Sequence, residues 1–471
     1  MRYVSTRGEA PSLGFAEAML AGLARDGGLY VPESWPRLDA KTIAGFTGRP
    51  YAEVAVEVIR LFIGDSIPDA DLARMAREAY GNFRHPAVAP LTQINTNTFL
   101  LELFHGPTLA FKDMAMQLLA RLMDHALAAG GERRTIVVAT SGDTGGAAVE
   151  AFRNGAQVDL VVLFPQGRIS DVQRRMMTTA AAANVSALAI DGTFDDCQAI
   201  VKGMFNHHAF SDRVSLSGVN SINWARIVAQ VVYYFTAAVA LGAPARKIAF
   251  TVPTGNFGDI YAGYVAQRMG LPIDRLVIAT NVNDILARTI ATGIYEPREV
   301  VPTTSPSMDI QVSSNFERLL FDAYQGDAAA IRALMGSLTQ SRRFALSADA
   351  LAAIRARFSA GRAGEDEVAA TIRTVKRETS NFVDPHTAVG IAVAEKETRD
   401  PAVPMVVLST AHAAKFPDAV EAACGARPPL PDWLHDLDKR PERITALAAD
   451  QSAVEAFVLA NSRAAQEGRA A

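Results

Sequence analysis

Residues 135–146 read Thr135-Ile136-Val137-Val138-Ala139-Thr140-Ser141-Gly142-Asp143-Thr144-Gly145-Gly146, and they decide the fold class. The first six residues form an apolar, β-branched run, which is typical of a strand buried on both faces of a sheet. A loop rich in glycine and hydroxyl groups follows, and the pattern becomes helical from about residue 145 to 153. A buried strand that passes through a short polar loop into a helix is the repeating unit of parallel α/β folds.

The same unit recurs along the chain. Apolar runs predict further strands, and segments with apolar residues three and four apart predict helices between them. We expect strands at 99–104, 158–164, 185–190, 214–217, 247–252, 276–280 and 404–408, and helices at 170–183, 194–206, 222–241 and 257–269. Repeated alternation of this kind predicts an α/β fold with doubly wound, mostly parallel sheets.

The composition changes on both sides of this core. Residues 1–92 predict short helices and end in a proline-bracketed segment, so we expect an N-terminal helical domain there. The core should span 93–425, and residues 426–471 predict a C-terminal helical extension. Within the core we expect two further regions, a mobile subdomain at about 133–220 and a helical insertion at about 314–380 whose helices cover 348–359 and 365–377.

The overall composition narrows the class of protein. The 471 residues are 49% hydrophobic and 20% charged, with a net charge of −4 at pH 7. We find neither a basic segment suited to nucleic acid nor an apolar run of the roughly 18 residues that a membrane span needs. The first residues lack an apolar signal segment, and Cys197 and Cys424 stand apart without metal-like spacing. We therefore expect a cytoplasmic protein with no metal site, nucleic-acid partner or membrane partner.

One lysine stands at a second junction between a loop and a helix, in His105-Gly106-Pro107-Thr108-Leu109-Ala110-Phe111-Lys112-Asp113-Met114-Ala115. Gly106 and Pro107 predict a loop, and the apolar spacing from Phe111 onward predicts a helix. Lys112 therefore falls in the first helical turn, where the positive end of the helix dipole lowers the pKa of an ammonium group. A lysine of lowered pKa suits Schiff-base chemistry, and a solvated lysine is the alternative.

Two more polar loops follow predicted strands. The loop Pro253-Thr254-Gly255-Asn256-Phe257-Gly258-Asp259 lets backbone N–H groups approach an anion through its glycines. It matches no nucleotide-binding fingerprint, so it predicts a cup for one phosphate monoester, with a plain turn as the alternative. The other loop is Leu408-Ser409-Thr410-Ala411-His412. Because ligands of open α/β sheets bind beyond the carboxyl ends of strands, all three strand-end loops should face one crevice.

One cofactor needs a lysine amine, a phosphate cup and a neutral hydroxyl at a ring nitrogen, and it is pyridoxal 5′-phosphate (PLP). Lys112, residues 255–259 and Thr410 could supply these three parts. The combination resembles the fold type II PLP enzymes, whose fold is similar to that of the tryptophan synthase β subunit. These enzymes catalyse eliminations and replacements at Cβ or Cγ of amino acids.

Six motifs make the resemblance closer. They follow the order found in threonine synthases of the longer branch, which is known from fungi and many bacteria, and they span residues 3 to about 418. The motifs are Tyr3-Val4-Ser5-Thr6-Arg7-Gly8, Asp26-Gly27-Gly28-Leu29-Tyr30-Val31-Pro32, His105-Gly106-Pro107-Thr108-Leu109-Ala110-Phe111-Lys112-Asp113, Ser141-Gly142-Asp143-Thr144-Gly145, Asn220-Ser221-Ile222-Asn223-Trp224-Ala225-Arg226 and Gly255-Asn256-Phe257-Gly258-Asp259. The chain is similar to this family along nearly its whole length.

The resemblance implies the last step of threonine biosynthesis, in which O-phospho-L-homoserine and water become L-threonine and phosphate. Lys112 would form the Schiff base with PLP and act as the base, and Thr410 would face the pyridine nitrogen. The cofactor phosphate would be held by Gly255, Asn256, Phe257, Gly258 and Asp259. Asp143 stands where many fold type II relatives carry Asn, a difference that the long threonine synthases share.

The same reaction predicts residues for the substrate. Its carboxylate needs backbone and hydroxyl donors, for which Ser141 and Thr144 are candidates. Asp143, which lies between them, is also expected among the substrate-binding residues. The substrate phosphate needs cationic or amide donors, and Asn223 and Arg226 lie three apart at a helix start, on one face. A surface salt bridge is the alternative for Arg226.

Two other functions compete with this interpretation. A related PLP phospho-lyase that releases 2-oxobutyrate would need the same lysine and phosphate pocket. A non-catalytic metabolite-binding homologue on the same fold would lack the PLP absorbance near 410–430 nm. We expect a monomer or a homodimer in each case.

Overall fold

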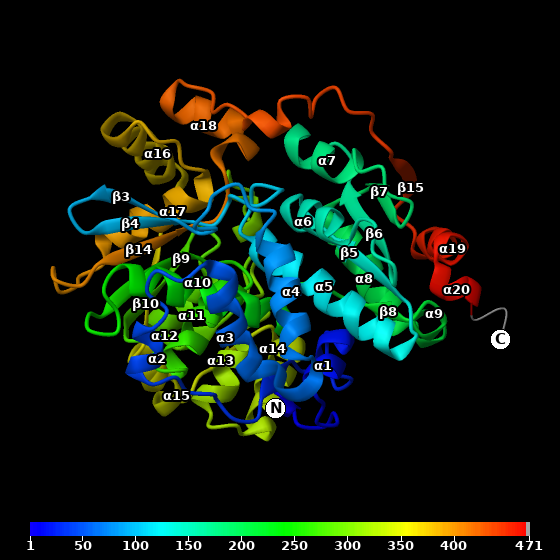
Figure 1. Cartoon of the computed structure of the whole chain (residues 1–471), viewed down its shortest axis with the longest axis horizontal. Helices are drawn as coiled ribbons and strands as arrows, with labels where there is room; N and C mark the ends of the chain where they lie inside the picture. The colour runs from blue at the N-terminus through cyan, green and yellow to red at the C-terminus, as the bar shows by residue number, and fades with distance from the viewer. Residues whose placement is uncertain (468–471) are drawn as a thin grey trace.

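The computed structural model describes residues 1–467 and is built around two mostly parallel sheets that stand side by side (Figure 1). The larger sheet has the order β13-β10-β9-β14-β4-β3, and only β3 runs antiparallel to its neighbour. Its strands are β3 (Leu91–Asn95), β4 (Thr98–Glu102), β9 (Ile248–Pro253), β10 (Ile273–Thr280), β13 (Phe358–Arg362) and β14 (Met405–Ser409). The predicted fold type, with doubly wound sheets, is confirmed.

The smaller sheet has the order β15-β7-β6-β5-β8, and all of its pairings are parallel. Its strands are β5 (Arg134–Ala139), β6 (Val158–Pro165), β7 (Val185–Asp191), β8 (Leu216–Ser217) and β15 (Thr445–Ala448). All eight residues of β6 are buried, as the continuous apolar run predicts for a central parallel strand.

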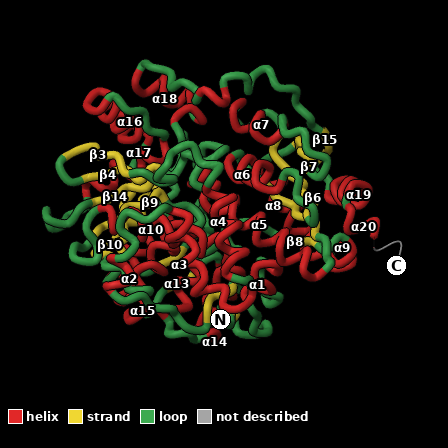
Figure 2. The backbone as a smooth tube through the Cα atoms, viewed as in Figure 1, coloured by secondary structure: helices red, strands yellow, loops and turns green. Residues whose placement is uncertain are grey.

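Helices cover both faces of each sheet, which Figure 2 shows as red coils around the yellow strands. On the larger sheet, α10 (Trp224–Ala240) and α11 (Gly258–Arg268) lie on one face, and α16 (Glu365–Thr379) and α17 (Pro385–Lys396) on the other. On the smaller sheet, α8 (Phe194–Asn206) and α19 (Gln451–Asn461) pack opposite α5 (Lys112–Gly130) and α6 (Asp143–Phe152). The N-terminal segment adds α1 (Phe15–Ala21), α2 (Ala40–Ala44), α3 (Tyr51–Ile63) and α4 (Asp69–Tyr80), with β1 (Tyr3–Ser5) paired to β2 (Tyr30–Pro32).

Helix α5 lies between the two sheets and positions the site (Figure 1). It packs against α4, α6 and α10, so its first two turns are buried nearly all round. The helix starts at Lys112, one residue after the predicted start at Phe111, and ends where Gly131 adopts a left-handed φ of 65°. A glycine at this position closes a helix without the steric cost that a side chain would add.

The structure corrects the predicted insertion and the C-terminal extension. The helix predicted at 348–359 ends earlier, as α15 (Ala348–Arg355), and β13 follows it and joins the edge of the larger sheet beside β10. The extension is not wholly helical, because β15 pairs with β7, and residues 468–471 lie outside the described residues. The partner strand supplies backbone hydrogen bonds in both cases, so tertiary pairing overrides a weak local β preference.

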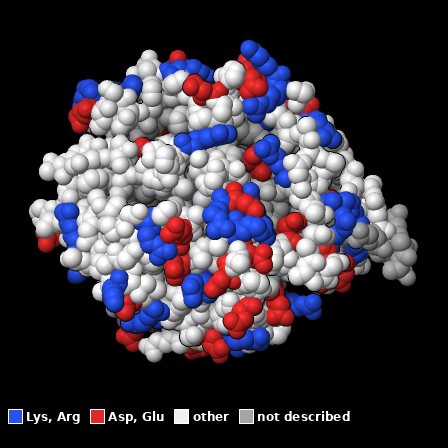
Figure 3. Space-filling view, in the orientation of Figure 1, with Lys and Arg blue, Asp and Glu red and all other residues white. Residues whose placement is uncertain are grey.

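On the face shown in Figure 3, Lys and Arg are interspersed with Asp and Glu. Within residues 1–467, none of the helices combines the length and the apolar character that crossing a bilayer requires.

Candidate active site

Lys112 occupies the first turn of α5 and is only 9% exposed. Its Nζ lies 3.5 Å from Oδ2 of Asp143 and 3.5 Å from Oγ of Ser307. Burial lowers the pKa of Lys112; Asp143 opposes this shift, and the charges of Lys415 and Arg226 reinforce it. The predicted direction of the pKa shift is therefore confirmed, with burial as its main cause in place of the helix dipole.

The loop before Lys112 is held by a buried carboxylate. Asp113 accepts hydrogen bonds from the backbone N–H of Thr108 at 2.7 Å and from its hydroxyl at 2.6 Å. Gly106 packs so closely on Asp113 that a Cβ added to the glycine would lie 2.5 Å from the Cβ of the aspartate. Burial raises the pKa of Asp113 to about 6. Gly106 is needed here because any side chain would push the loop away from the helix.

Asp143, at the start of α6, joins the polar loop of the smaller sheet to Lys112. Its Oδ1 accepts from Nζ of Lys415 at 2.6 Å and from Nε2 of Gln173 at 2.9 Å. Although burial opposes ionisation, Lys415 and Lys112 hold the pKa of Asp143 far below its usual range. This residue is therefore a buried carboxylate that faces two ammonium groups.

The second predicted loop lies at the start of α11. Phe257 adopts a left-handed φ of 67° and turns the chain from β9 into the helix. A Cβ added to Gly255 would lie 2.7 Å from the carbonyl oxygen of Ser307, the residue that also contacts Lys112. Asn315 braces the turn by donating from its side chain to the backbone oxygen of Asn256.

The third predicted loop follows β14 and touches the lysine loop directly. The backbone N–H of Phe111 donates to the carbonyl oxygen of Thr410 at 2.8 Å, and Thr410 is 4% exposed. The three strand-end loops thus meet around Lys112, as predicted. The loop that carries Asp143 follows β5 of the smaller sheet, and the other two follow β9 and β14 of the larger sheet, so the loops meet between two sheets and not at the edge of one.

The two residues predicted for the substrate phosphate differ in their surroundings. Arg226 is 2% exposed and donates to the carbonyl oxygen of Val219 at 2.9 Å, so the surface salt-bridge alternative is wrong. Among the described residues, its buried Nε has no hydrogen-bond partner, and burial lowers the pKa of Arg226 to about 10. The side chain of Asn223 donates to the backbone oxygens of Met19 and Gly218, so it has no free amide proton for a ligand.

Ser141 and Thr144 flank Asp143 in the same loop and are half-buried. Within the described part of the chain, neither hydroxyl takes part in an intramolecular hydrogen bond. Their hydroxyl groups therefore retain the capacity to donate to an anion.

Family models cover most of the chain. They are described as threonine synthase N terminus at residues 2–80, pyridoxal-phosphate dependent enzyme at 83–364, and threonine synthase, C-terminal, at 387–458. A threonine synthase from Pseudomonas aeruginosa is 51% identical over 97% of this chain and 98% of its own length. The chain belongs to the threonine synthase family. Solved structures agree: PLP-bound threonine synthase from Brucella melitensis (TM-score 0.96, 62% identity, 98% and 100% coverage) and threonine synthase from yeast (TM-score 0.92, 38% identity, 98% and 98% coverage).

The residues around Lys112 fit the cofactor of the threonine synthase family. A buried lysine of lowered pKa suits covalent capture of an aldehyde. The first turn of α11, approached through Gly255 and Gly258, presents backbone N–H groups for a phosphate. The unpartnered Nε of Arg226 leaves one more donor for an anion in the same buried region.

Sequence reasoning missed a buried network behind this threonine synthase site. Nδ1 of His386 lies 2.7 Å from Oδ2 of Asp384, and Nε2 of His386 accepts from the backbone N–H of Ser307 at 3.3 Å. Asp384 also accepts from the hydroxyl of Thr387, which lies 3.1 Å from the hydroxyl of Ser409. Asp384 thereby links the loop beside Lys112 to the end of β14.

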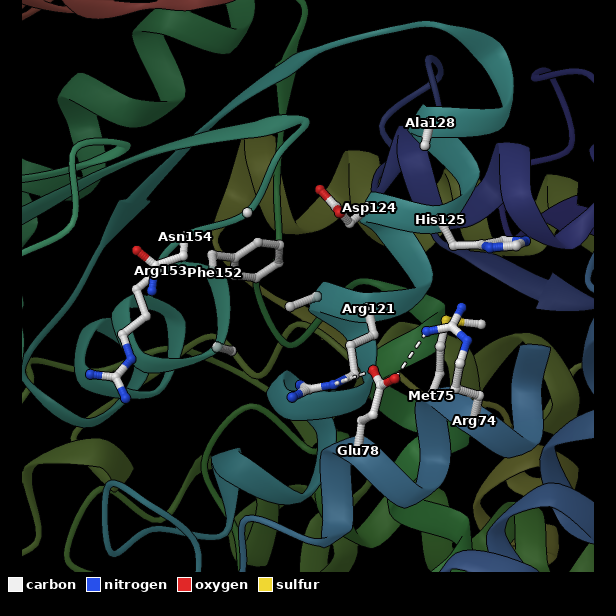
Figure 4. Close-up of a pocket in the computed structure, with 13 residues that line it drawn as sticks. Arg74, Met75, Glu78, Arg121, Asp124, His125, Ala128, Phe152, Arg153 and Asn154 are labelled. Atoms are coloured by element: carbon white, nitrogen blue, oxygen red, sulfur yellow. Dashed lines mark hydrogen bonds and ion pairs between the residues drawn. The ribbon is translucent and has the colours of Figure 1, made fainter. Parts of the chain in front are cut away.

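A separate cavity of about 400 Å³ lies between α4, α5 and the end of α6 (Figure 4). Glu78 stands between Arg74 and Arg121 at its mouth, and Asp124 and His125 line it from α5. Arg121 follows Lys112 along α5 by nine residues, or about 13.5 Å at 1.5 Å per residue. None of the predicted site residues lines this cavity, so it is distinct from the site.

Proposed function

We propose that the chain catalyses the conversion of O-phospho-L-homoserine and water to L-threonine and inorganic phosphate, with PLP as its cofactor. The observation that carries this proposal is a buried lysine of lowered pKa that feels the charge of a buried arginine, whose Nε has no hydrogen-bond partner among residues 1–467, in a chain that matches threonine synthases along almost its whole length. The lysine suits proton transfer, and the arginine suits an anionic substrate.

We assign the cofactor to Lys112 and to two of the loops around it. Lys112 binds the aldehyde covalently, residues 255–259 receive the phosphate, and Thr410 faces the ring nitrogen. When bound, PLP supplies an electron sink that acidifies the protons next to the amino group of a substrate. Lys112 then takes and returns these protons, which requires the neutral amine that its burial favours.

We assign the substrate to the space between the two sheets. The hydroxyls of Ser141 and Thr144 and the N–H groups at the start of α6 bind its carboxylate, next to Asp143. Arg226 binds its phosphate, because its buried Nε has no hydrogen-bond partner within residues 1–467 and an anion would satisfy it. Asn223 supports Arg226 indirectly by capping α10.

We also propose a cytoplasmic location, in keeping with two isolated cysteines and a free phosphorylated amino acid as substrate. A monomer or a homodimer without a nucleic-acid or membrane partner fits the mixed surface charge. The predicted domain boundaries at about residues 92 and 425, and the mobility of residues 133–220, stay predictions.

The decisive experiment incubates the PLP-loaded protein with O-phospho-L-homoserine and measures both phosphate and threonine. Equal amounts of phosphate and L-threonine would support the proposal. Phosphate together with 2-oxobutyrate would identify the related phospho-lyase. Neither product, together with no PLP absorbance near 410–430 nm, would indicate a metabolite-binding homologue.

A further inference from the structure

The Asp143 carboxylate faces two ammonium groups unequally. Nζ of Lys415 lies 2.6 Å from Oδ1, which also accepts from Gln173, whereas Nζ of Lys112 lies 3.5 Å from Oδ2. Hydrogen-bond strength falls steeply over this range of distances, so most of the carboxylate's charge is matched by Lys415.

Lys415 is fixed in this position. It belongs to the short helix η3 (Ala413–Lys415), and its side chain is 1% exposed. Its Nζ also donates to the carbonyl oxygen of Thr108 at 2.9 Å, and its own carbonyl oxygen accepts from the hydroxyl of Ser170. The ammonium group is therefore held between the lysine loop and the loop of Asp143.

Several charged groups face Lys112 from the surrounding elements. They are Asp143 from α6, Lys415 from η3, Arg226 from α10 and Asp259 from α11. Asp143 is the group in contact with the Lys112 amine, and Lys415 and Arg226 both repel a positive charge on it. Removing Lys415 would leave Asp143 free to pair fully with Lys112, and the ammonium form of Lys112 would be stabilised.

We propose that Lys415 is a positioning residue that occupies the Asp143 carboxylate and so prevents Lys112 from being locked into a full ion pair. The Lys112 amine is thereby kept ready to lose its proton and to capture the cofactor aldehyde. This proposal rests on the proposed role of Lys112 as the residue that binds PLP.

The test measures the protonation of Lys112 without cofactor or substrate. Full-length protein is freed of PLP with hydroxylamine, labelled with acetic anhydride over a range of pH, and digested, and mass spectrometry gives the acylated fraction of Lys112. Lys415→Gln keeps hydrogen-bonding groups for Asp143 and Thr108 but removes the charge. We expect it to raise the midpoint of Lys112 labelling by about one pH unit or more, while Lys415→Arg stays near the wild type. An unchanged midpoint in folded Lys415→Gln would overturn the proposal.

A double-mutant cycle keeps the test decisive if Lys415→Gln does not fold. Asp143→Asn removes the partner of both lysines, and the double variant places two neutral amides together. Because Lys415 is proposed to act through Asp143, the Lys112 midpoint of the double variant should be close to that of Asp143→Asn alone. A rise of about one pH unit in the double variant would show that Lys415 acts by direct repulsion and would refute the proposal. Lys396→Gln is the control, because Lys396 is 49% exposed, pairs with Glu367, and should leave the midpoint unchanged.

This labelling result is independent of turnover. If the wild type makes no threonine but Lys415→Gln shifts the Lys112 midpoint, the proposed function is contradicted and the role of Lys415 is supported. If the wild type makes threonine but Lys415→Gln leaves the Lys112 midpoint unshifted, the proposed function is supported and the role of Lys415 is contradicted.

Discussion

Replacing Arg226 by methionine should separate stability from substrate binding. Burial lowers the pKa of Arg226 to about 10, from an ordinary value above 12. At ~1.4 kcal/mol for each pKa unit, keeping this side chain charged destabilises the folded protein by roughly 3 kcal/mol. That cost is fully present at neutral pH and disappears only when the pH rises past the pKa of the unfolded chain.

Arg226→Met removes this cost and keeps a side chain of similar length. It also leaves the carbonyl oxygen of Val219 unpaired, which costs about 1–3 kcal/mol. The free energy of unfolding should therefore stay the same or rise by up to about 2 kcal/mol. Binding of the substrate phosphate should weaken, because a hydrogen bond to a charged group contributes about 1.5–3 kcal/mol. That range corresponds to a KM for O-phospho-L-homoserine raised about tenfold to a hundredfold.

Arg318 provides the matched control. It is equally buried and burial also lowers its pKa to about 10, but its guanidinium donates to Tyr30, Asn315 and Ile222. Arg318→Met strands three acceptors, at about 1–3 kcal/mol each, so it should lose roughly 3 kcal/mol of stability. Urea unfolding of the PLP-free proteins and steady-state kinetics measure the two effects. If Arg226→Met were as unstable as Arg318→Met, or kept the wild-type KM, the reasoning would be refuted.

Four further outcomes are expected. Lys112→Ala should abolish turnover and the absorbance near 410–430 nm, while the circular dichroism spectrum stays native. Full activity in this variant would contradict the role of Lys112 as the lysine that binds PLP. Gly255→Ala should weaken PLP binding and lower Tm, because its Cβ would lie 2.7 Å from a loop carbonyl. Gly336→Ala, whose added Cβ would point into open space, is the control for both measurements. Thr410→Asp should retain PLP yet form threonine at least about tenfold more slowly, ~1.4 kcal/mol in the barrier, whereas Thr410→Ser should stay near the wild type in the same assay. Burial raises the pKa of Asp113 to about 6, so the folded state holds this proton more tightly than the unfolded chain. The contribution of Asp113 to the free energy of unfolding therefore falls as pH rises from about 4 through 6. Asp113→Asn should remove that decline from unfolding curves measured across this range, and an unchanged decline would show that another group causes it.

Long, strongly patterned segments could be predicted from the sequence. The buried run of β6 and the start of α5 at Lys112 are within a residue of their expected positions, because each follows from local burial and spacing. The strand β13 could not be predicted in the same way. Its residues Phe358–Arg362 include Ser, Ala and Gly, and they become a strand because β10 offers an unpaired edge.

Some residues of the site could likewise be predicted from the sequence, and others could not. Lys112, Asp143 and Gly255 lie in, or directly after, loops whose glycines and polar groups are conspicuous in sequence, and the structure brings all three together. Lys415 follows two alanines and carries no local signal, and Asp384 acts on Lys112 only through two other residues. Contacts of this kind depend on which segments the topology brings together, and no local pattern encodes them.

The place of β14 in the larger sheet has a consequence for how the protein is made. This strand lies between β4 and β9, yet the ribosome synthesises it after both of them and after most of the chain. Until β14 emerges, the nascent chain holds two sheet fragments whose facing edges are unpaired, and such edges invite pairing with other chains. Thr410, directly after β14, is therefore among the last site residues to arrive. The cofactor pocket can close only after translation is nearly complete, so a prematurely terminated chain should aggregate and should not form a smaller enzyme.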